Sequence, residues 1–375
     1  MKWNWQHKDW PDFRWDQSEL AQLESRHLRQ SGMMIGCIRH FKADDRNRLV
    51  VELITDEAVK TSEIEGEFLD RDSVQSSILR NFGLLADPRR VRPAERGIAD
   101  MLTDLHTRFD QPLSHQMLFD WHSMLMSGRR DLQTVGQYRT HEEPMQVVSG
   151  RVDQPKIHFE APPSRNIRRE MDAFMAWWQR TAPDGSATLP SLTRAGIAHL
   201  YFVCIHPFED GNGRIGRALS EKSLAEHQGE PTLIALSQTI EEGRKTYYER
   251  LEKHNKDIEI TDWLVYFGQT ILQAQKRSLD LVDFLIGKTR LFDRLRGQIN
   301  LRQQKVLERM FREGLSGFKG GLSAENYIRI TGTSRATATR DLAKLVELGA
   351  LVRTGELKST RYWLTVALDR KPPNQ

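Results

Sequence analysis

Cysteine is scarce in this sequence, which has only Cys37 and Cys204 among its 375 residues. Two isolated cysteines form neither a disulfide framework nor a cysteine-based metal cluster, and they are typical of proteins in a reducing compartment. Long apolar runs are also missing, since no stretch reaches the eighteen residues expected of a membrane span. The first residues lack the apolar core of a signal peptide. We therefore expect a cytoplasmic protein that has no membrane partner.

The charges of the chain are unevenly distributed. Charged residues make up 28% and hydrophobic residues 38%, which is typical of a globular protein, and the length allows two or three domains. Residues 290–375 hold 17 Lys and Arg against 8 Asp and Glu, a balance of +9. The whole chain carries +4, so residues 1–289 carry −5. This asymmetry indicates an anionic partner for the C-terminal part.

Residues 206–217 combine the chemically richest residue types of the chain, in the order His-Pro-Phe-Glu-Asp-Gly-Asn-Gly-Arg-Ile-Gly-Arg. The Gly-Asn-Gly segment, residues 211–213, can turn sharply and bring backbone N–H groups close to a ligand. Residues 214–226 have the apolar spacing of a helix. The start of a helix attracts anions, because its first N–H groups are unpaired and its dipole is positive there. The stretch therefore predicts an anion site.

Four side chains of this stretch suit nucleotide chemistry. Arg214 and Arg217 are three residues apart and can face one anion. Two cations do not stabilise a helix N-terminus, so their presence is explained if the site holds phosphates. Asp210 is a hard oxygen ligand that suits Mg²⁺, and His206 can act as a base near neutral pH. The alternative, a helix corner with a surface histidine and solvated charges, leaves this combination unexplained.

The stretch resembles the signature of the Fic family, H-x-F-x-[D/E]-G-N-G-R-x-x-R, and every fixed position matches. The resemblance implies a mostly helical catalytic core that transfers AMP from ATP to a hydroxyl of a target protein. It also implies a role for each matching residue. His206 deprotonates the Ser, Thr or Tyr hydroxyl, Asp210 holds Mg²⁺, and Phe208 seats the loop in the core. The phosphates are bound by an anion hole of Gly211, Asn212 and Gly213, with Arg214 and Arg217 on the β and γ phosphates.

A second motif ends a helix that we expect to begin near residue 45. Thr61 and Glu65 are four residues apart and share a helix face, and Gly66 suits the position that terminates a helix. The three residues resemble the inhibitory motif of the family, [S/T]-x-x-x-E-[G/N]. That resemblance implies that Glu65 pairs with Arg217 where the γ-phosphate would bind, and a guanidinium fork suits a carboxylate. A solvated glutamate at a helix end is the alternative.

Two further segments have counterparts in the family. The apolar residues 147–148 and 157–159 flank turn residues and predict a hairpin, which lies where Fic proteins have a flap that aligns an extended target segment. An ordinary surface hairpin is the alternative. Tyr247 and Tyr248 resemble part of a segment that encloses the nucleotide. We expect one of them near adenine or ribose and the other in the core.

The C-terminal residues resemble a winged helix-turn-helix domain. We expect helices over 301–313, 323–331 and 334–348, followed by a hairpin around Gly355. The third helix of that fold enters the major groove of DNA, so Arg335, Thr339 and Arg340 are candidates for contacts with base edges or phosphates. Winged helices also serve as dimerisation or protein-docking modules, and this alternative stays open.

Together these patterns predict a mainly α protein. We expect a tryptophan-rich extension and inhibitory helix in residues 1–90, a Fic-type helical core with a β-hairpin flap in 91–288, and a winged helix domain in 298–370. The most direct interpretation is an autoinhibited protein adenylyltransferase that uses ATP and Mg²⁺ to modify a protein target, itself included. One alternative is a DNA-binding regulator with a nucleotide-sensing core, and another is removal of AMP from a modified protein. A homodimer is compatible with the sequence.

Overall fold

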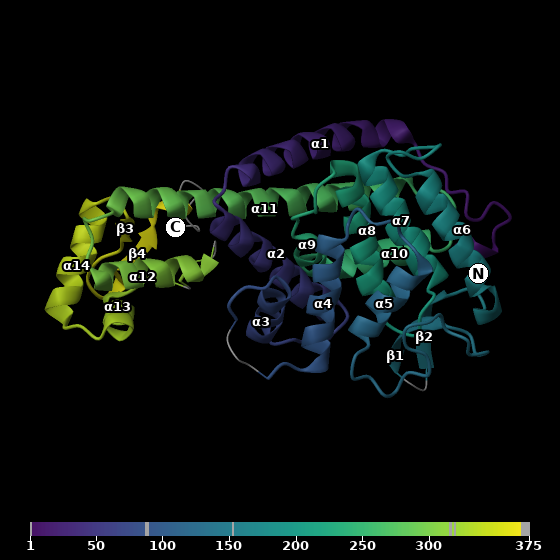
Figure 1. Cartoon of the computed structure of the whole chain (residues 1–375), viewed down its shortest axis with the longest axis horizontal. Coiled ribbons are helices and arrows are strands. Elements are labelled where there is room, and N and C mark those ends of the chain that lie inside the picture. The colour runs from purple at the N-terminus through teal and green to yellow at the C-terminus, as the bar shows by residue number, and fades with distance from the viewer. Residues whose placement is uncertain (1, 87–89, 152–153, 315–316, 319, 369–375) are drawn as a thin grey trace. The chain divides into compact units, whose positions relative to one another are not determined.

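The computed structural model describes residues 2–86, 90–151, 154–314, 317–318 and 320–368, and it is mainly helical (Figure 1). The chain divides into two compact units, Met1–Ser278 and Leu279–Gln375. In the described residues, sheet structure consists of two antiparallel hairpins, one in each unit. None of the helices described is both long enough and apolar enough to cross a membrane.

The tryptophan-rich N-terminal arm packs onto the body of the first unit. Within the short 3-10 helix η1 (Asn4–Gln6), the indole N–H of Trp5 donates to the carbonyl of Glu160 at 2.7 Å. The indole N–H of Trp10 donates to the carboxylate of Glu170 at 2.9 Å. The arm is thus fixed by aromatic groups that bury a large apolar surface and keep one polar partner each.

Helices α1 (Gln17–Arg39) and α2 (Ala43–Ile64) follow the arm. Helix α1 extends as far as Arg39. Its second half remains packed: Ser31 and Met34 are buried, and the Ser31 hydroxyl accepts from Gln275 on α11 (Thr261–Leu295) at 2.8 Å. Tertiary contacts therefore stabilise the second half of α1, where apolar residues no longer recur at regular helical spacing.

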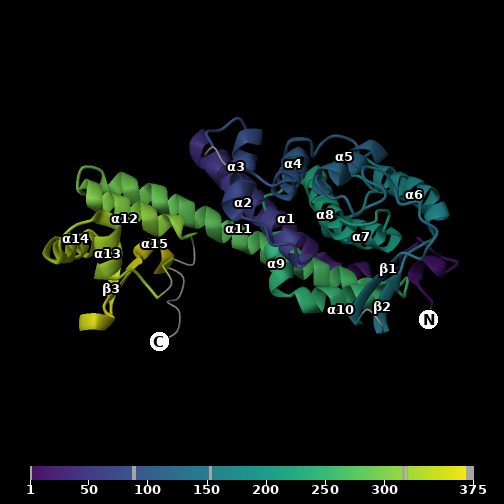
Figure 2. The ribbon, with the colours of Figure 1, turned by 90° about the horizontal axis from the view of Figure 1, so that it is seen from below.

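The core of the first unit is a set of helices around α7 (Ser191–Ile205), which is buried on nearly all sides. Helix α8 (Asn212–Gln228) packs along α7, and both views show the two lying together (Figures 1 and 2). The remaining helices of this unit are α3 (Arg71–Asn81), α4 (Pro93–Thr107), α5 (His115–Leu125), η2 (Ser164–Asn166), α6 (Ile167–Arg180), α9 (Leu236–Glu242) and α10 (Arg244–His254).

The predicted hairpin is formed by β1 (Gln146–Arg151) and β2 (Gln154–Glu160). Its pairing shifts register between Val147 and Val148. Phe159 is buried against the body, where it meets the ring of Trp3 edge-on at 5.5 Å. One end of the hairpin is therefore anchored, while apolar side chains at Val148 and Ile157 are exposed.

The second unit has the element order that the sequence predicts. Helices α12 (Leu301–Arg312), α13 (Ala324–Thr331) and α14 (Arg335–Glu347) precede a hairpin of β3 (Leu351–Thr354) and β4 (Arg361–Leu364). The short 3-10 helix η4 (Leu357–Ser359) and the short helix α15 (Thr365–Leu368) also belong to this unit. Gly332 ends α13 at a φ of 69°, and the Ser334 hydroxyl caps α14.

Candidate active site

The site begins where α7 ends, at His206. This residue has a left-handed backbone (φ 52°, ψ 59°), which is rare outside glycine and is typical of functional positions. The ring Nδ1 lies 3.1 Å from the carbonyl of Val203 and donates to it, so Nε2 is the nitrogen left with a lone pair. Arg139 donates to the carbonyl of His206 at 2.8 Å and holds the backbone from the other side.

Burial lowers the pKa of His206 to about 4. Removing a charged imidazolium from water is unfavourable, so the neutral ring is the stable form at neutral pH. The carbonyl of Val203 and the carboxylates of Glu65 and Asp210 oppose this shift without reversing it. At neutral pH the Nε2 nitrogen of His206 therefore has a free lone pair and carries no proton.

The turn that follows is held by Asn212, the first residue of α8. Its side-chain oxygen accepts from the backbone N–H of Phe208 at 3.0 Å, and its amide donates to the Phe208 carbonyl at 2.8 Å. The ring of Phe208 is fully buried and stacks on His122, with the ring centres 4.2 Å apart. Gly211 supplies the left-handed step of the turn with a φ of 82°. These contacts hold the turn between α7 and α8 in one conformation.

Asp210 lies in this turn and faces two cations, Arg129 and Arg214. Arg129 donates to Oδ2 at 2.7 Å, the Gly211 N–H donates to Oδ1 at 2.6 Å, and Arg214 lies 3.5 Å from Oδ1. Burial alone would raise the pKa of this carboxyl, but Arg214, Arg129 and the N–H group outweigh burial and lower it. Asp210 is therefore an ionised, half-buried carboxylate. Arg129 belongs to no motif, and the sequence analysis missed it.

The two predicted arginines enter the site from the first turns of α8. Arg217 donates from Nε to the Thr61 hydroxyl at 2.8 Å and from Nη2 to the Thr61 carbonyl at 2.9 Å. Its Nη2 also lies 2.8 Å from Oε1 of Glu65. Thr61 and Glu65 of the predicted inhibitory motif thus both contact Arg217, the second arginine of residues 206–217. Although burial opposes the charge of Arg217, Glu65 raises its pKa.

The carboxylate of Glu65 lies against the backbone of the glycine turn. A Cβ atom placed on Gly213 would come within 2.2 Å of Glu65 Oε1, so the carboxylate fills the space beside this glycine. Gly66 follows at a φ of 83°, the left-handed position that ends α2. Arg214 does not contact this carboxylate. It pairs instead with Glu67, at 2.7 Å between Nη1 and Oε2, a partner that the sequence analysis missed.

The two tyrosines take different positions. Tyr247 is 1% exposed, and its hydroxyl lies 2.8 Å from Nε2 of His199 in the core. Tyr248 is 37% exposed, and its hydroxyl lies 3.2 Å from the carbonyl of Ile64 and 3.3 Å from Oε2 of Glu65. Tyr248 is therefore the tyrosine whose ring borders the site.

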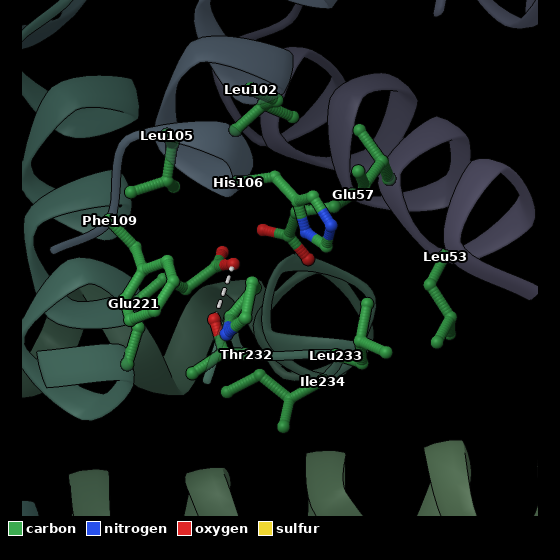
Figure 3. Close-up of a pocket in the computed structure, with 13 residues that line it drawn as sticks. Leu53, Glu57, Leu102, Leu105, His106, Phe109, Glu221, Thr232, Leu233 and Ile234 are labelled. Atoms are coloured by element: carbon green, nitrogen blue, oxygen red, sulfur yellow. Dashed lines mark hydrogen bonds between the residues drawn. The ribbon is translucent and has the colours of Figure 1, made fainter. Parts of the chain in front are cut away.

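Below the site, two carboxyl groups are buried together. Figure 3 shows Glu57 from α2 and Glu221 from α8 directed toward one another, with His106 beside them. Burial raises the pKa of both, that of Glu221 well above its usual value. Glu57 accepts from the backbone N–H of Ser237, and a proton shared between the two carboxyl groups joins Glu57 to Glu221. The adjoining cavity of about 20 Å³ holds roughly one water molecule.

The three DNA-contact candidates lie on α14 in the second unit. Arg335, Thr339 and Arg340 are exposed, whereas Ala338 and Leu342 of the same helix are fully buried. The helix is therefore amphipathic, with these candidates on its solvent side. Their role stays a prediction.

The first unit is thus a helical domain in which a glycine turn and two arginines lie at the start of α8, with a neutral histidine beside them. Residues 112–224 match the model of the Fic/DOC family. Residues 3–84 match a second model, described as a domain of unknown function, DUF4172.

Curated relatives match parts of this chain. Protein adenylyltransferase Fic of Nematostella vectensis is 30% identical over 116 residues, which are 31% of this chain and 25% of that protein. The probable protein adenylyltransferase aq_aa38 of Aquifex aeolicus is 25% identical over 181 residues, 46% of this chain and 50% of that protein. Protein adenylyltransferase Fic of Drosophila melanogaster is 31% identical over 143 residues, 38% and 26% of the two chains. The chain therefore spans a quarter to a half of these relatives.

Solved structures show the same fold. A Fic family protein from Desulfovibrio desulfuricans G20 superimposes with a TM-score of 0.51 at 19% identity, over 92% of this chain and 96% of that chain. Fic-1 from C. elegans superimposes with a TM-score of 0.51 at 20% identity, over 73% and 75% of the two chains. The domain match, the relatives and the fold agree in supporting the Fic family.

Proposed function

We propose that this protein is an autoinhibited protein adenylyltransferase, which transfers AMP from ATP to a Ser, Thr or Tyr hydroxyl of a target protein. The observation that carries the proposal is the carboxylate of Glu65, which lies 2.8 Å from Arg217 and against Gly213. A carboxylate occupies this anion site in the way that a phosphate would. Relatives whose names denote protein adenylyltransferases support the same reading.

In this mechanism His206 is the general base. Its neutral Nε2 takes the proton from the target hydroxyl, whose oxygen then attacks the α-phosphorus of ATP. The bond between the α-phosphorus and the bridging oxygen breaks, and pyrophosphate leaves. The backbone of residues 211–213 and the cations Arg214 and Arg217 bind the phosphates and stabilise the charge that moves onto the leaving group.

Asp210 fits a magnesium site. It is ionised and half-buried, and Mg²⁺ is commonly held by one or two carboxylates together with substrate phosphates and water. In the described residues, no three His, Cys, Asp or Glu side chains gather into a metal site. When bound, Mg²⁺ would neutralise phosphate charge. Arg129 holds the carboxylate of Asp210 in the present structure.

Inhibition follows from the position of Glu65. As long as its carboxylate pairs with Arg217, the outer phosphate of ATP meets a like charge and loses its arginine. Thr61 strengthens this state, because its hydroxyl and carbonyl accept two further hydrogen bonds from Arg217. Movement of the end of α2 would then open the site.

The hairpin of β1 and β2 is the proposed contact for the target. It carries exposed apolar side chains at Val147, Val148 and Ile157, and strand edges bind extended peptides through their backbone groups. The arm residue Trp5 anchors the base of this hairpin at Glu160.

The test compares the wild type, Glu65→Gly and Glu65→Gly/His206→Ala, each incubated with α-labelled ATP and Mg²⁺ and read by intact mass. We expect Glu65→Gly alone to gain an AMP group through self-modification. Glu63→Gly is the matched control, because Glu63 lies at the same helix end and pairs with Lys60. ATP binding without any transfer in Glu65→Gly would contradict the proposal. Loss of AMP from the labelled product on adding wild type would favour removal of AMP.

A second candidate function is DNA binding by the second unit. Arg335 and Arg340 are exposed on α14, within a segment that carries +9. We expect the full chain to bind duplex DNA with an affinity that falls steeply as salt rises, and Arg335→Ala/Arg340→Ala to bind more weakly. Equal binding by the variant and the wild type at low salt would contradict this assignment.

A further inference from the structure

The end of α2 places two glutamates on either side of one glycine. The Gly66 N–H donates to the carbonyl of Glu63 at 3.0 Å, and the Glu67 N–H donates to the carbonyl of Ser62 at 3.0 Å. With Gly66 at a φ of 83°, these bonds form the Schellman pattern of a helix terminus. The backbone positions of Glu65 and Glu67 are therefore set by the same turn.

Each glutamate pairs with a different arginine of α8. Glu65 Oε1 lies 2.8 Å from Arg217 Nη2, and Glu67 Oε2 lies 2.7 Å from Arg214 Nη1. The arginine side chains are nearly inaccessible, at 1% and 6% exposed, whereas those of the glutamates are 29% and 38% exposed. The arginines are thus fixed parts of the site, and the glutamates are the partners that can leave.

We propose that Glu67 is a second inhibitory residue, which occupies Arg214 as Glu65 occupies Arg217. The inference rests on the proposed function, because it assumes that both arginines serve the phosphates of a nucleotide. A phosphate that binds Arg214 has to displace the carboxylate of Glu67, since both seek the same guanidinium N–H groups.

The two pairs act on different phosphates. Arg214 lies 3.5 Å from Asp210, the proposed magnesium ligand, so it serves the inner phosphate near the metal. Arg217 lies about one helical turn further along α8 and serves the outer one. Glu67 therefore controls binding of the β-phosphate, and Glu65 controls binding of the γ-phosphate.

A structural role alone explains the Glu67 contact less well. Solvent screens the pair on the side of Glu67, whose side chain is 38% exposed, and this reduces what the pair adds to folding stability. The pair does match the charge of Arg214. Nε of Arg214 is buried and makes no hydrogen bond in the described structure, so this guanidinium keeps an unused donor.

The experiment measures dissociation constants of ATP, ADP and AMP by calorimetry for the full-length wild type, Glu67→Gln, Glu65→Gln and the double variant. We expect Glu67→Gln to bind both ADP and ATP about tenfold more tightly, the typical effect of one charge-assisted contact. Glu65→Gln should tighten ATP alone, and neither change should alter AMP. Glu63→Gln is the control, because Glu63 shares the helix end and pairs with Lys60.

An unchanged ADP dissociation constant in Glu67→Gln would overturn the inference. If Glu65→Gln still bound ATP more tightly, the proposed function would survive that result, whereas failure of every variant to bind ATP would overturn both. Glu67→Asp separates contact from charge: it keeps the charge but shortens the side chain, so we expect it to resemble Glu67→Gln. Behaviour like the wild type would show that a general negative charge, and not the contact with Arg214, sets the affinity.

Transfer activity gives a second measurement. Glu67→Gln alone should remain inactive in self-modification, because Glu65 still holds Arg217. The double variant Glu65→Gln/Glu67→Gln should show a lower KM for ATP than Glu65→Gln, with a similar kcat. A double variant with the same KM as Glu65→Gln would contradict the role of Glu67.

Discussion

Arg217 on α8 hydrogen-bonds to both the hydroxyl and the carbonyl of Thr61 on α2, across 156 residues of sequence. These two contacts and the ion pair with Glu65 bind the end of α2 to the start of the helix that forms the anion site. The position of α2 therefore determines how accessible the site is.

Thr61→Val should weaken this connection. The substitution preserves shape but leaves Nε of the buried Arg217 without its acceptor, so we expect the free energy of unfolding to fall by about 1–3 kcal/mol. Thr55→Val is the matched control on the same helix, because the Thr55 hydroxyl bonds only back to the Val51 carbonyl of its own helix. Equal losses in the two variants, measured by urea unfolding, would show that the Arg217 contact adds nothing.

The pH profile of transfer should reflect the low pKa of His206. Burial lowers this pKa to about 4, and the base acts in its neutral form, so activity should be lost only as pH falls toward 4. Removing Glu65 takes away a charge that raises the pKa, so Glu65→Gly moves the loss further toward acid. We expect initial rates of self-modification by Glu65→Gly to differ little between pH 5.5 and 7.5. A half-maximal rate near pH 6.5 would mean that the ring is solvated.

Glu221→Gln should stabilise the protein more at high pH than at low pH. The folded-state pKa of Glu221 is raised well above its usual value, so the wild type loses stability as pH rises from the unfolded pKa of about 4.3 to the folded one. Glutamine carries no charge to bury and avoids this loss. The difference in unfolding free energy between the two proteins should therefore grow from pH 5 to pH 8. A constant difference would indicate that Glu221 ionises normally.

Arg129→Gln should lower the magnesium requirement of transfer. Arg129 donates to the Asp210 oxygen at 2.7 Å, so the metal and the guanidinium compete for one carboxylate. In a Glu65→Gly background, we expect the half-saturating Mg²⁺ concentration to fall by about two- to fivefold, the range for a partly exposed ion pair. The neighbouring Arg130→Gln serves as the control, because Arg130 is exposed. An unchanged requirement would show that the metal does not displace Arg129.

The sequence by itself determined the features that are local in the chain. The turn at Gly211, the helix that follows it and the glycine that ends α2 follow from backbone preferences over a few residues, although α8 begins at Asn212, two residues earlier than expected. The short hairpin follows from local apolar pattern, as does the order of three helices and a hairpin in the second unit. The burial of Phe208 was implied by the resemblance of the motif. The pairing of Glu65 with Arg217 was accessible only through the resemblance of two motifs.

The tertiary structure decided which distant residues meet. Glu67 on Arg214, Arg129 on Asp210 and the buried pair Glu57 and Glu221 have no spacing that would reveal them, because packing brings their helices together. Packing also decides that Tyr247 is buried and Tyr248 borders the site, although they are neighbours in sequence. The low pKa of His206 has the same origin, since desolvation depends on everything that surrounds the ring.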